Sequence, residues 1–349
     1  MKIGQHSLGS GHPCYVIAEL SANHGGEFQI AADTIRAMKE AGADAVKLQT
    51  YTADTLTIAS DKPPFKITGG TLWDGKTLHE LYQEAFMPWD WQPKLQALAT
   101  ELGLDFFSTP FDDSAVDFLE GMNVPAHKIA SFEMIDHPLL RKVASTGKPI
   151  IMSTGMASLE EIEESMEVLR KANSGPVALL KCTSAYPADP TEMNLLTIQD
   201  MQRRFGVPIG LSDHTMGHTV PVAAVALGAC IIEKHFILDR TQGGPDSTFS
   251  MEPREFREMV DAIRVVEQAL GKHDNYVISE KEAKSKAFRR SLFAVKDIQA
   301  GEAFTPDNVR CIRPGHGLPP RLLEQVLDSE AVCDIKRGTP LSMDHLQST

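Results

Sequence analysis

The stretch PIGLSDHTMGHTVPVAAVALGACIIEKHF, residues 208–236, contains one complete strand–helix–strand repeat. Two short apolar runs, 208–213 and 230–236, enclose an alanine- and valine-rich segment that we expect to form a helix beginning near His218. Parallel strands need a long crossover connection, and a helix is the usual one. The stretch therefore predicts two neighbouring parallel strands with a helix packed over them.

The same alternation extends along most of the chain. Eight apolar runs have the length and composition of strands: 14–20, 45–50, 105–110, 126–131, 149–154, 177–183, 208–213 and 230–236. Segments with helical periodicity lie between and after them, as at 28–41, 158–171 and 253–270. Eight such repeats fit a (β/α)8 TIM barrel of about 250 residues.

An open, doubly wound sheet is the alternative architecture. Its first strand would lead into a glycine-rich phosphate loop with G-x-G-x-x-G spacing. The corresponding segment here is SANHGG, residues 21–26, which lacks that spacing. The sequence therefore favours the closed barrel.

The pattern changes after Gly271. Residues 272–286 are polar and lysine-rich, as a linker would be, and 287–349 hold short strand-like runs broken by Gly and Pro. We expect a barrel domain over 1–271, a linker over 272–286 and a small, mostly β domain over 287–349. Within the barrel, residues 51–90 form an unusually long connection after the second strand, which we expect to be an ordered lid.

Composition excludes several classes of function. The chain of 349 residues has a formal net charge of -13, so its average surface would repel nucleic acid. No N-terminal stretch has the layout of a secretory signal, and no apolar run approaches membrane-spanning length. The five cysteines are scattered without a C-x-x-C pair, which predicts neither a disulfide framework nor a thiolate zinc site. A reduced, cytoplasmic setting is expected.

Polar side chains gather where the predicted strands end. In a (β/α)8 barrel the carboxyl ends of the strands face the catalytic mouth. All eight runs end in polar residues, so a ligand-binding mouth is predicted there. These residues are Glu19, Lys47, Gln49, Ser108, Thr109, Lys128, Ser131, Glu133, Ser153, Thr154, Lys181, Thr183, Tyr186, Ser212, Asp213, His214, Glu233 and His235.

His214 and His235 end the seventh and eighth strands and come from neighbouring positions in the barrel. Two imidazoles at that spacing can share one divalent ion and leave positions open for water or substrate. Asp213 and Glu233 would be available to orient the two rings. The alternative is that each histidine only forms hydrogen bonds at the rim, but the pairing at equivalent heights favours the metal site.

Lys47, Lys128 and Lys181 are predicted to project from three different strands around the mouth. A lysine on a barrel strand is costly to bury unless it is paired. Three of them could hold a carboxylate and a phosphate together. Internal ion pairs with Glu19 and Glu133 are the alternative, and Lys128 could also be the Schiff-base lysine of an aldolase.

The segments at the strand ends resemble those of the sialic acid synthases. VIAELSANHGG, AVKLQTY, FFSTPFD, KIASFE, KPIIMSTGM, LLKCTSAYP, GLSDHT and EKHF occur in the order and spacing of that family. The stretch RRSLFAVKDIQAGEAFT…RPGHGL is similar to the antifreeze-protein-like (SAF) domain that follows their barrel. The resemblance to the family covers nearly the whole chain. Within the family, the insert GGTLWDGKTLHELYQEAFMPWDW is similar to that of pseudaminic acid synthases.

This resemblance implies a role for individual residues. His214 and His235 match metal ligands, and Glu19 and Glu133 match two catalytic carboxylates whose acid and base roles could be exchanged. Positions that grip phosphoenolpyruvate correspond to Lys47, Thr109, Lys128, Ser131, Ser153 and Ser212. Sugar-side positions correspond to Gln49, Tyr186 and Asp246, and Arg313 matches an arginine that the SAF domain inserts into the partner subunit's site. Ser184 stands where neuraminate synthases often carry Asn, so its ligand contact is expected to differ.

The activity implied by the resemblance is the condensation of phosphoenolpyruvate with a 2,4-diacetamido-2,4,6-trideoxy-L-altrose and water, giving pseudaminic acid and phosphate. The implied cofactor is a divalent metal, Mn²⁺ first, with Mg²⁺ or Co²⁺ as alternatives. The implied assembly is a homodimer in which each C-terminal domain caps the partner's site. The alternatives are an N-acetylneuraminate or legionaminate synthase, a Schiff-base pyruvate aldolase, and a non-catalytic carbohydrate-binding protein.

Overall fold

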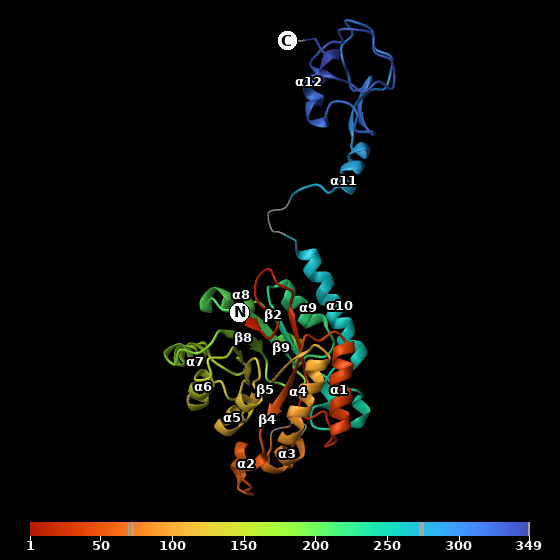
Figure 1. The fold of residues 1–349 in the computed structure, drawn as a ribbon. Helices are drawn as coiled ribbons and strands as arrows, with labels where there is room; N and C mark the ends of the chain where they lie inside the picture. Colours follow the sequence, from red (N-terminus) through yellow and green to blue (C-terminus); the bar gives the residue numbers. More distant parts are fainter. Residues whose placement is uncertain (69, 71–72, 272–275, 348–349) are drawn as a thin grey trace. The chain divides into compact units, whose positions relative to one another are not determined.

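Parallel strands close into a barrel in the computed structural model, which describes residues 1–68, 70, 73–271 and 276–347 (Figure 1). Among these residues the closed sheet has eight strands in the order β10-β3-β4-β5-β6-β7-β8-β9. Their bounds are β3 (Tyr15–Glu19), β4 (Ala45–Thr50), β5 (Asp105–Pro110), β6 (His127–Ile129), β7 (Ile150–Ser153), β8 (Val177–Cys182), β9 (Ile209–Asp213) and β10 (Ile231–His235). The predicted TIM barrel is confirmed.

Helices surround the barrel as its outer layer. They are α1 (Phe28–Glu40), α4 (Gln92–Glu101), α5 (Asp113–Gly121), α6 (His137–Ala144), α7 (Leu159–Lys171), α8 (Thr197–Phe205), α9 (Thr219–Ala226) and α10 (Pro253–Leu270). Local sequence signals set several of their ends. Ser158 caps α7 in a capping box with Glu161, and Pro253 occupies the first turn of α10.

Side chains on each strand alternate between the barrel interior and the helix layer, because the strand period is two. The register places Glu19 beside Lys47 and Glu233 beside Ser212, so these four side chains share the interior. The two ends of the barrel then differ. At the amino ends of the strands, the hairpin β1 (Lys2–Ile3) and β2 (His6–Ser7) is held by the 2.8 Å contact between His6 Nδ1 and Asp105 Oδ2.

The insert after β4 lies beyond the carboxyl ends of the strands, where Figure 1 shows α2 and α3 together. Its described residues form α2 (Ala53–Leu56), α3 (Leu78–Ala85) and two short 3-10 turns, Pro63–Phe65 and Trp89–Trp91. Capping boxes begin both α2 and α3. The insert thus carries regular structure at this end of the barrel, while positions 69, 71 and 72 lie outside the described residues.

The chain divides into two compact units, 1–271 and 272–349. The described part of the second unit contains α11 (Glu280–Ser285), β11 (Ser291–Ala294), β12 (Val309–Ile312) and α12 (Leu323–Leu327), with 3-10 turns at Lys286–Phe288, Pro320–Leu322 and Met343–His345. It has a hydrophobic core of its own, built by residues that include Leu292, Phe304, Val326, Ile335 and Leu341. Across the described residues, no helix combines the length and apolar character needed to span a membrane.

Candidate active site

A cavity of about 550 Å³ opens at the carboxyl ends of the barrel strands. Five of the residues predicted from the sequence line it: Gln49, Glu133, Tyr186, His235 and Asp246. Other lining residues come from the insert, including Tyr51, Trp73 and Tyr82. The predicted mouth and the insert therefore build one cavity.

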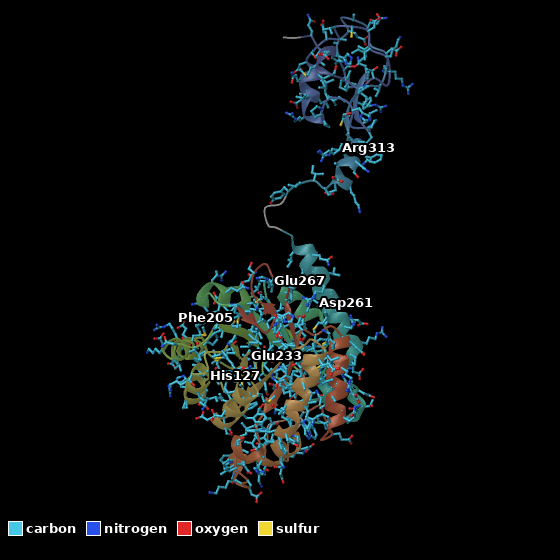
Figure 2. All side chains as sticks on the ribbon, viewed as in Figure 1. His127, Phe205, Glu233, Asp261, Glu267 and Arg313 are labelled. Atoms are coloured by element: carbon cyan, nitrogen blue, oxygen red, sulfur yellow. The ribbon has the colours of Figure 1, made fainter. Side chains whose placement is uncertain are left out.

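Beside this cavity, the barrel interior holds a buried cluster of charges. Glu233, which Figure 2 labels within the barrel, lies at its centre. Its Oε1 lies 3.5 Å from Lys47 Nζ and 3.5 Å from Lys128 Nζ, and Glu19 Oε2 lies 2.8 Å from Lys47 Nζ. All four side chains are buried. Burial lowers the pKa of Lys128, whereas Lys47 has a raised pKa because the attraction of Glu19 and Glu233 outweighs its burial. Two ammonium groups are thus held close together inside the barrel by carboxylates.

Hydroxyl groups surround the two lysines. Lys128 Nζ donates to Ser153 Oγ at 2.8 Å, Lys47 Nζ to Thr109 Oγ1 at 3.3 Å, and Ser212 Oγ to Glu233 Oε1 at 3.2 Å. Hydroxyls and ammonium groups together are donors suited to phosphate and carboxylate oxygens. Six residues are predicted to bind such an anion, and the structure brings five of them together: Lys47, Thr109, Lys128, Ser153 and Ser212.

Ser131, the sixth residue of that set, follows β6, the strand that carries Lys128. Its Oγ accepts a hydrogen bond from Gly155 N at 3.0 Å. A Cβ at position 155 would lie 2.2 Å from Ser184 Oγ and 2.7 Å from Ser131 Oγ. Glycine at 155 therefore allows two hydroxyls and a backbone N–H to approach one another closely beside Ser153.

His214 and His235 lie side by side at the rim, with ring centroids 5.4 Å apart. His214 Nδ1 lies 3.0 Å from the carbonyl oxygen of Thr183, which fixes the orientation of its ring. His235 Nδ1 lies 3.9 Å from Asp246 Oδ2 and has no hydrogen-bond partner although it is buried. Burial, His214 and the nearby lysines lower the pKa of His235 well below its ordinary value, so the ring is neutral and its lone pair is available.

A divalent metal would fit this pair of imidazoles. Histidine binds a metal in its neutral form, through a ring nitrogen that carries no proton. The neutral ring of His235, whose Nδ1 has no hydrogen-bond partner, meets this requirement. Within the described parts of the chain, no group of three or more His, Cys, Asp or Glu side chains is arranged to hold an ion. The protein would thus supply two ligands, and the remaining positions would fall to water or substrate.

A chain of hydrogen bonds links the predicted sugar-side residues to Glu19. Gln49 Nε2 donates to Glu19 Oε1 at 3.1 Å and to Ser21 Oγ at 2.9 Å, and Ser21 Oγ donates to Asp246 Oδ2. Burial raises the pKa of Asp246. The tilted ring of Tyr186 packs on His214, with centroids 4.4 Å apart. Ser21 was missed in the sequence, because it follows the strand end that we examined for polar residues.

Two predictions from the sequence are wrong, those for Lys181 and Asp213. Lys181 does not join Lys47 and Lys128, because the register pairs it with Leu211 on the helix-facing side, and its Nζ donates to the Cys182 carbonyl at 2.8 Å. Asp213 does not hydrogen-bond to the histidine rings, because it also faces outward and forms a buried ion pair with Lys234. Each is one residue away from an interior position, Lys181 from Cys182 and Asp213 from Ser212.

Cys182 takes the interior position that had been expected for Lys181. Burial opposes ionisation of its thiol, but His214 and Ser131 together lower its pKa to about 7. Contact with the same thiol raises the pKa of His214 although burial acts in the opposite direction. Counting alternate residues back from Ser184 would have placed Cys182 inside the barrel.

Arg313 belongs to the second unit, where it follows β12 and its side chain is exposed. Figure 2 labels Arg313 within this unit.

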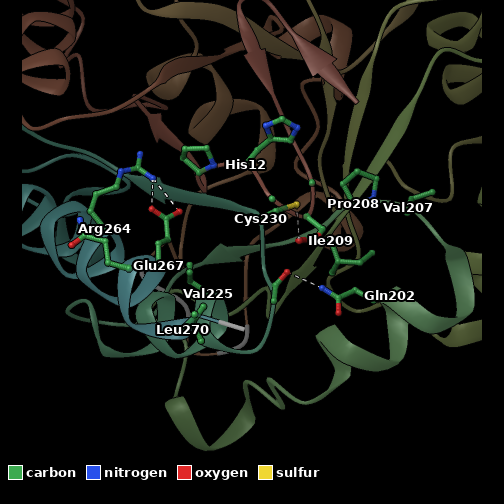
Figure 3. A pocket seen from close by; sticks show the side chains of 17 residues that line it. His12, Gln202, Val207, Pro208, Ile209, Val225, Cys230, Arg264, Glu267 and Leu270 are labelled. Atoms are coloured by element: carbon green, nitrogen blue, oxygen red, sulfur yellow. Dashed lines mark hydrogen bonds and ion pairs between the residues drawn. The ribbon is translucent and has the colours of Figure 1, made fainter. Parts of the chain in front are cut away.

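A second cavity, of about 940 Å³, lies at the amino ends of the strands (Figure 3). Its lining includes Ile209 at the start of β9, Cys230 just before β10, and Glu267 near the end of α10. Arg264, which also lines it, is paired with Glu267 and Asp44 at 3.2 Å each. In (β/α)8 enzymes this end serves stability, whereas chemistry occurs at the carboxyl ends. We therefore assign the candidate active site to the smaller cavity.

Comparisons with known proteins agree with the architecture and the resemblance. A family model described as the NeuB family matches residues 34–275, and one described as the SAF domain matches residues 289–347. The pseudaminic acid synthase of Helicobacter pylori is 45% identical over 335 residues, which cover 96% of this chain and 98% of that protein. The pseudaminic acid synthase of Campylobacter jejuni is 45% identical over 333 residues, covering 95% and 96%.

Among solved structures, the N-acetylneuraminic acid synthetase of Leptospira borgpetersenii in complex with citrate is similar to this chain. It matches with a TM-score of 0.72 at 32% identity, covering 82% of this chain and 94% of that one. The predicted resemblance to the sialic acid synthases, including the greater likeness to pseudaminic acid synthases, is confirmed.

Proposed function

The chain belongs to the NeuB family, and from this premise we propose that it condenses phosphoenolpyruvate with a 2,4-diacetamido-2,4,6-trideoxy-L-altrose and water, giving pseudaminic acid and phosphate. It is then an enzyme, a transferase that forms a carbon–carbon bond. The observation that carries the proposal is the pair of buried lysines, 47 and 128, near two adjacent imidazoles in a molecule 45% identical to pseudaminic acid synthases over nearly its whole length.

Phosphoenolpyruvate would bind at the charge cluster. Lys47 and Lys128 supply the positive charge, while Thr109, Ser131, Ser153 and Ser212 donate hydrogen bonds to phosphate and carboxylate oxygens. The lysines are already held in place by Glu233 and Glu19 at 2.8–3.5 Å, so little reorganisation is needed when the anion arrives.

His214 and His235 would hold a divalent ion, for which we propose Mn²⁺ first and Mg²⁺ or Co²⁺ as alternatives. When bound, such an ion supplies Lewis-acid polarisation of a carbonyl oxygen. Asp246 and Tyr186 lie against these histidines, and Gln49 is linked to Asp246 through Ser21. These residues would orient the sugar so that its aldehyde carbon faces the phosphoenolpyruvate.

The reaction then balances as follows. C3 of phosphoenolpyruvate forms a bond to the aldehyde carbon, water adds to C2, and the C2–O bond to phosphate breaks as phosphate leaves. Glu133, which lines the cavity, would orient and deprotonate the water, and Glu19 would exchange a proton with the new hydroxyl. Gln49, which donates to Glu19 Oε1 at 3.1 Å, would hold that carboxylate in place.

A product assay tests this proposal. Phosphoenolpyruvate is supplied with each of three hexoses in parallel, the precursors of pseudaminic, legionaminic and N-acetylneuraminic acid, and the products are identified by mass spectrometry. We expect efficient turnover of the first, with oxygen-18 from the bridging position leaving in phosphate. Label retained in the sugar acid, or no condensation with any hexose, would refute the proposal.

A Schiff-base aldolase is the competing function. Its lysine must be a free amine, and the lowered pKa of Lys128 suits that chemistry. However, Lys128 Nζ is occupied by Ser153 at 2.8 Å, the Ile129 carbonyl at 3.2 Å and Glu233 at 3.5 Å. Borohydride trapping with pyruvate would reveal the aldolase, and we expect no covalent adduct.

The pH profile should report Glu133. Burial raises its pKa from 4.5 to about 7, although its backbone and Lys128 act in the opposite direction and Asp136 adds to the rise. Because the folded-state pKa lies above the ordinary value, the carboxyl is protonated below about pH 7 and ionised above it. We expect kcat/KM to rise about tenfold per pH unit up to this value and then level off. Glu133→Gln should lower the plateau and remove this limb, and a wild-type profile flat through about pH 7 would contradict the assignment.

We also propose a homodimer in which Arg313 completes the partner subunit's site. Large apolar side chains are exposed after several barrel strands: Ile58, Phe132, Met156 and Met216 are 51–60% exposed. Exposed apolar residues gathered around one opening are typical of a surface that another protein covers. Arg313 is exposed in its own unit, so its guanidinium is not buried within that unit.

Mixing two inactive variants tests this assembly. Arg313→Ala removes the arginine, and Lys128→Met disables the barrel site; mixed after co-refolding or co-expression, they should regain up to about a quarter of wild-type activity, because one site in four pairs two intact elements. Analytical ultracentrifugation should show a dimer. A monomer, or mixed chains without activity, would refute action in the partner subunit.

We place the enzyme in the cytoplasm, since the five cysteines are all free and a reducing compartment keeps them so. Cell fractionation that recovers the activity outside the cytoplasm would contradict this.

A further inference from the structure

A buried ion pair lies next to the two histidines that are proposed to hold the metal. The register of β9 and β10 ends with Lys234 opposite Asp213. The next residues along the chain are His235 and His214. Because side chains alternate between the two faces of a strand, the ion pair points toward the helix layer, whereas the two adjacent imidazoles point toward the barrel interior. The ion pair and the histidine pair thus occupy opposite faces of the same two chain segments.

The ammonium group of Lys234 bonds to the residues on both sides of His214. Its Nζ donates to Asp213 Oδ2 and to the carbonyl oxygen of Thr215. The carboxylate of Asp213 also accepts from Thr215 N at 3.1 Å and from Thr215 Oγ1 at 3.0 Å. All three side chains are at most 1% exposed. These hydrogen bonds close a turn around His214 and attach it to the strand that carries His235. Lys234, Asp213 and Thr215 are called the clamp below.

The chain turns toward solvent directly after the clamp. Met216, the residue that follows Thr215, is 51% exposed. Gly217 has a φ of +72°, in the left-handed region that favours glycine. His214 is therefore the last residue before a loop that leaves the barrel, and Thr215 is the point at which the start of that loop is fixed.

The clamp supplies the connection between His214 and β10. Contacts on the other side of His214 come from residues that follow β8. Its Nδ1 lies 3.0 Å from the carbonyl oxygen of Thr183, and its own carbonyl accepts from Ala188 N at 3.0 Å. These contacts hold His214 relative to β8, whereas Lys234 holds it relative to the strand that carries His235.

We propose that Lys234 and Asp213 are positioning residues for the metal, because the clamp holds the backbone of residue 214 so that its imidazole stays beside that of His235. The ring centroids are 5.4 Å apart. This inference rests on the proposed function, which gives the ion to these two histidines. The ion pair acts through the backbone and touches neither the ion nor the substrate. Residues that orient metal ligands typically contribute about 10- to 100-fold to metal affinity.

The alternative is that the ion pair only stabilises the barrel. Apolar side chains of similar volume often replace a buried ion pair without loss of stability. If stability were its whole role, the double variant Asp213→Leu, Lys234→Met would fold and bind metal as the wild type does. The positioning role predicts a different result, because leucine and methionine fill the space but cannot hydrogen-bond to Thr215.

The test measures the Kd of the full-length chain for Mn²⁺ by electron paramagnetic resonance and calorimetry, and stability by urea denaturation. The variants are Lys234→Met, the double variant Asp213→Leu, Lys234→Met, and the control Leu140→Ala. Leu140 is buried on α6, so its truncation destabilises the barrel without changing the clamp. We expect the Kd to rise about 10- to 100-fold in both clamp variants and to stay unchanged in the control. The double variant should be more stable than Lys234→Met, so it carries the test if the single variant fails to fold.

The outcomes separate the clamp from the proposed function. Unchanged Mn²⁺ affinity in the double variant, or an equal loss in Leu140→Ala, would overturn the inference while the proposed function stands. A wild type that binds no Mn²⁺ would overturn both the inference and the metal role. Weaker Mn²⁺ binding in the clamp variants alone, with a wild type that condenses phosphoenolpyruvate with no hexose, would support the clamp and refute the proposed function.

Discussion

Replacing His235 with alanine is expected to abolish retention of the divalent ion and to lower kcat by about 10³-fold or more. Loss of Lewis-acid stabilisation removes several kcal/mol from the transition state, and each 1.36 kcal/mol is about tenfold in rate. No described group of three protein ligands exists to compensate. With His214 alone, one protein ligand would remain, so the ion should be lost on dialysis. Metal content by mass spectrometry and the electron paramagnetic resonance of added Mn²⁺ measure this loss directly.

The matched control is His218→Ala. His218 lies four residues after His214, at the start of α9, where its side chain makes no capping hydrogen bond. It should therefore retain metal and activity. His214→Ala should behave as His235→Ala does, and chelation of the wild type should be reversed by Mn²⁺. Unchanged metal content in both the 214 and 235 variants would rule out the proposed ligands.

The barrel was predictable from the sequence because strand and helix periodicities differ and repeat along the chain. The helix over Pro253–Leu270 was predicted with its bounds, since proline and glycine mark its two ends. Strand ends also identified the mouth. A packed core rarely contains polar side chains, so many of them at the strand ends indicate a binding site.

The face of each polar residue was less predictable. A shift of one residue along a strand exchanges the interior and exterior faces of the barrel. The apolar runs in the sequence do not mark the strand ends to within one residue. Lys181 and Asp213 were placed inside for this reason, and Cys182 was overlooked. The partner of Glu233 was also unpredictable, because Lys47 and Lys128 lie more than 100 residues away in sequence and meet it only when β10 closes on β3.

Glu233 connects these observations, because its carboxylate lies 3.5 Å from both buried lysines, Lys47 and Lys128. Glu233→Gln leaves Lys128 without a counter-ion in the barrel interior, where it must stay charged and unpaired or lose its proton. Removing one partner of a buried ion pair costs about 3–5 kcal/mol, so the free energy of unfolding should fall by about that amount in urea denaturation. By contrast, Glu167→Gln breaks an exposed pair with Arg170 and should change stability little.

Phosphoenolpyruvate should stabilise the Glu233→Gln variant more than it stabilises the wild type. Its anionic groups would replace the missing carboxylate beside Lys47 and Lys128, and a ligand that binds only the folded state raises stability in proportion to its affinity. In the double variant Glu233→Gln, Lys128→Met no unpaired ammonium remains at position 128. Part of the lost stability should therefore return, while affinity for phosphoenolpyruvate stays low. If the two changes were additive in stability and the ligand rescued neither variant, Glu233 would be a core residue with no part in presenting the lysines to substrate.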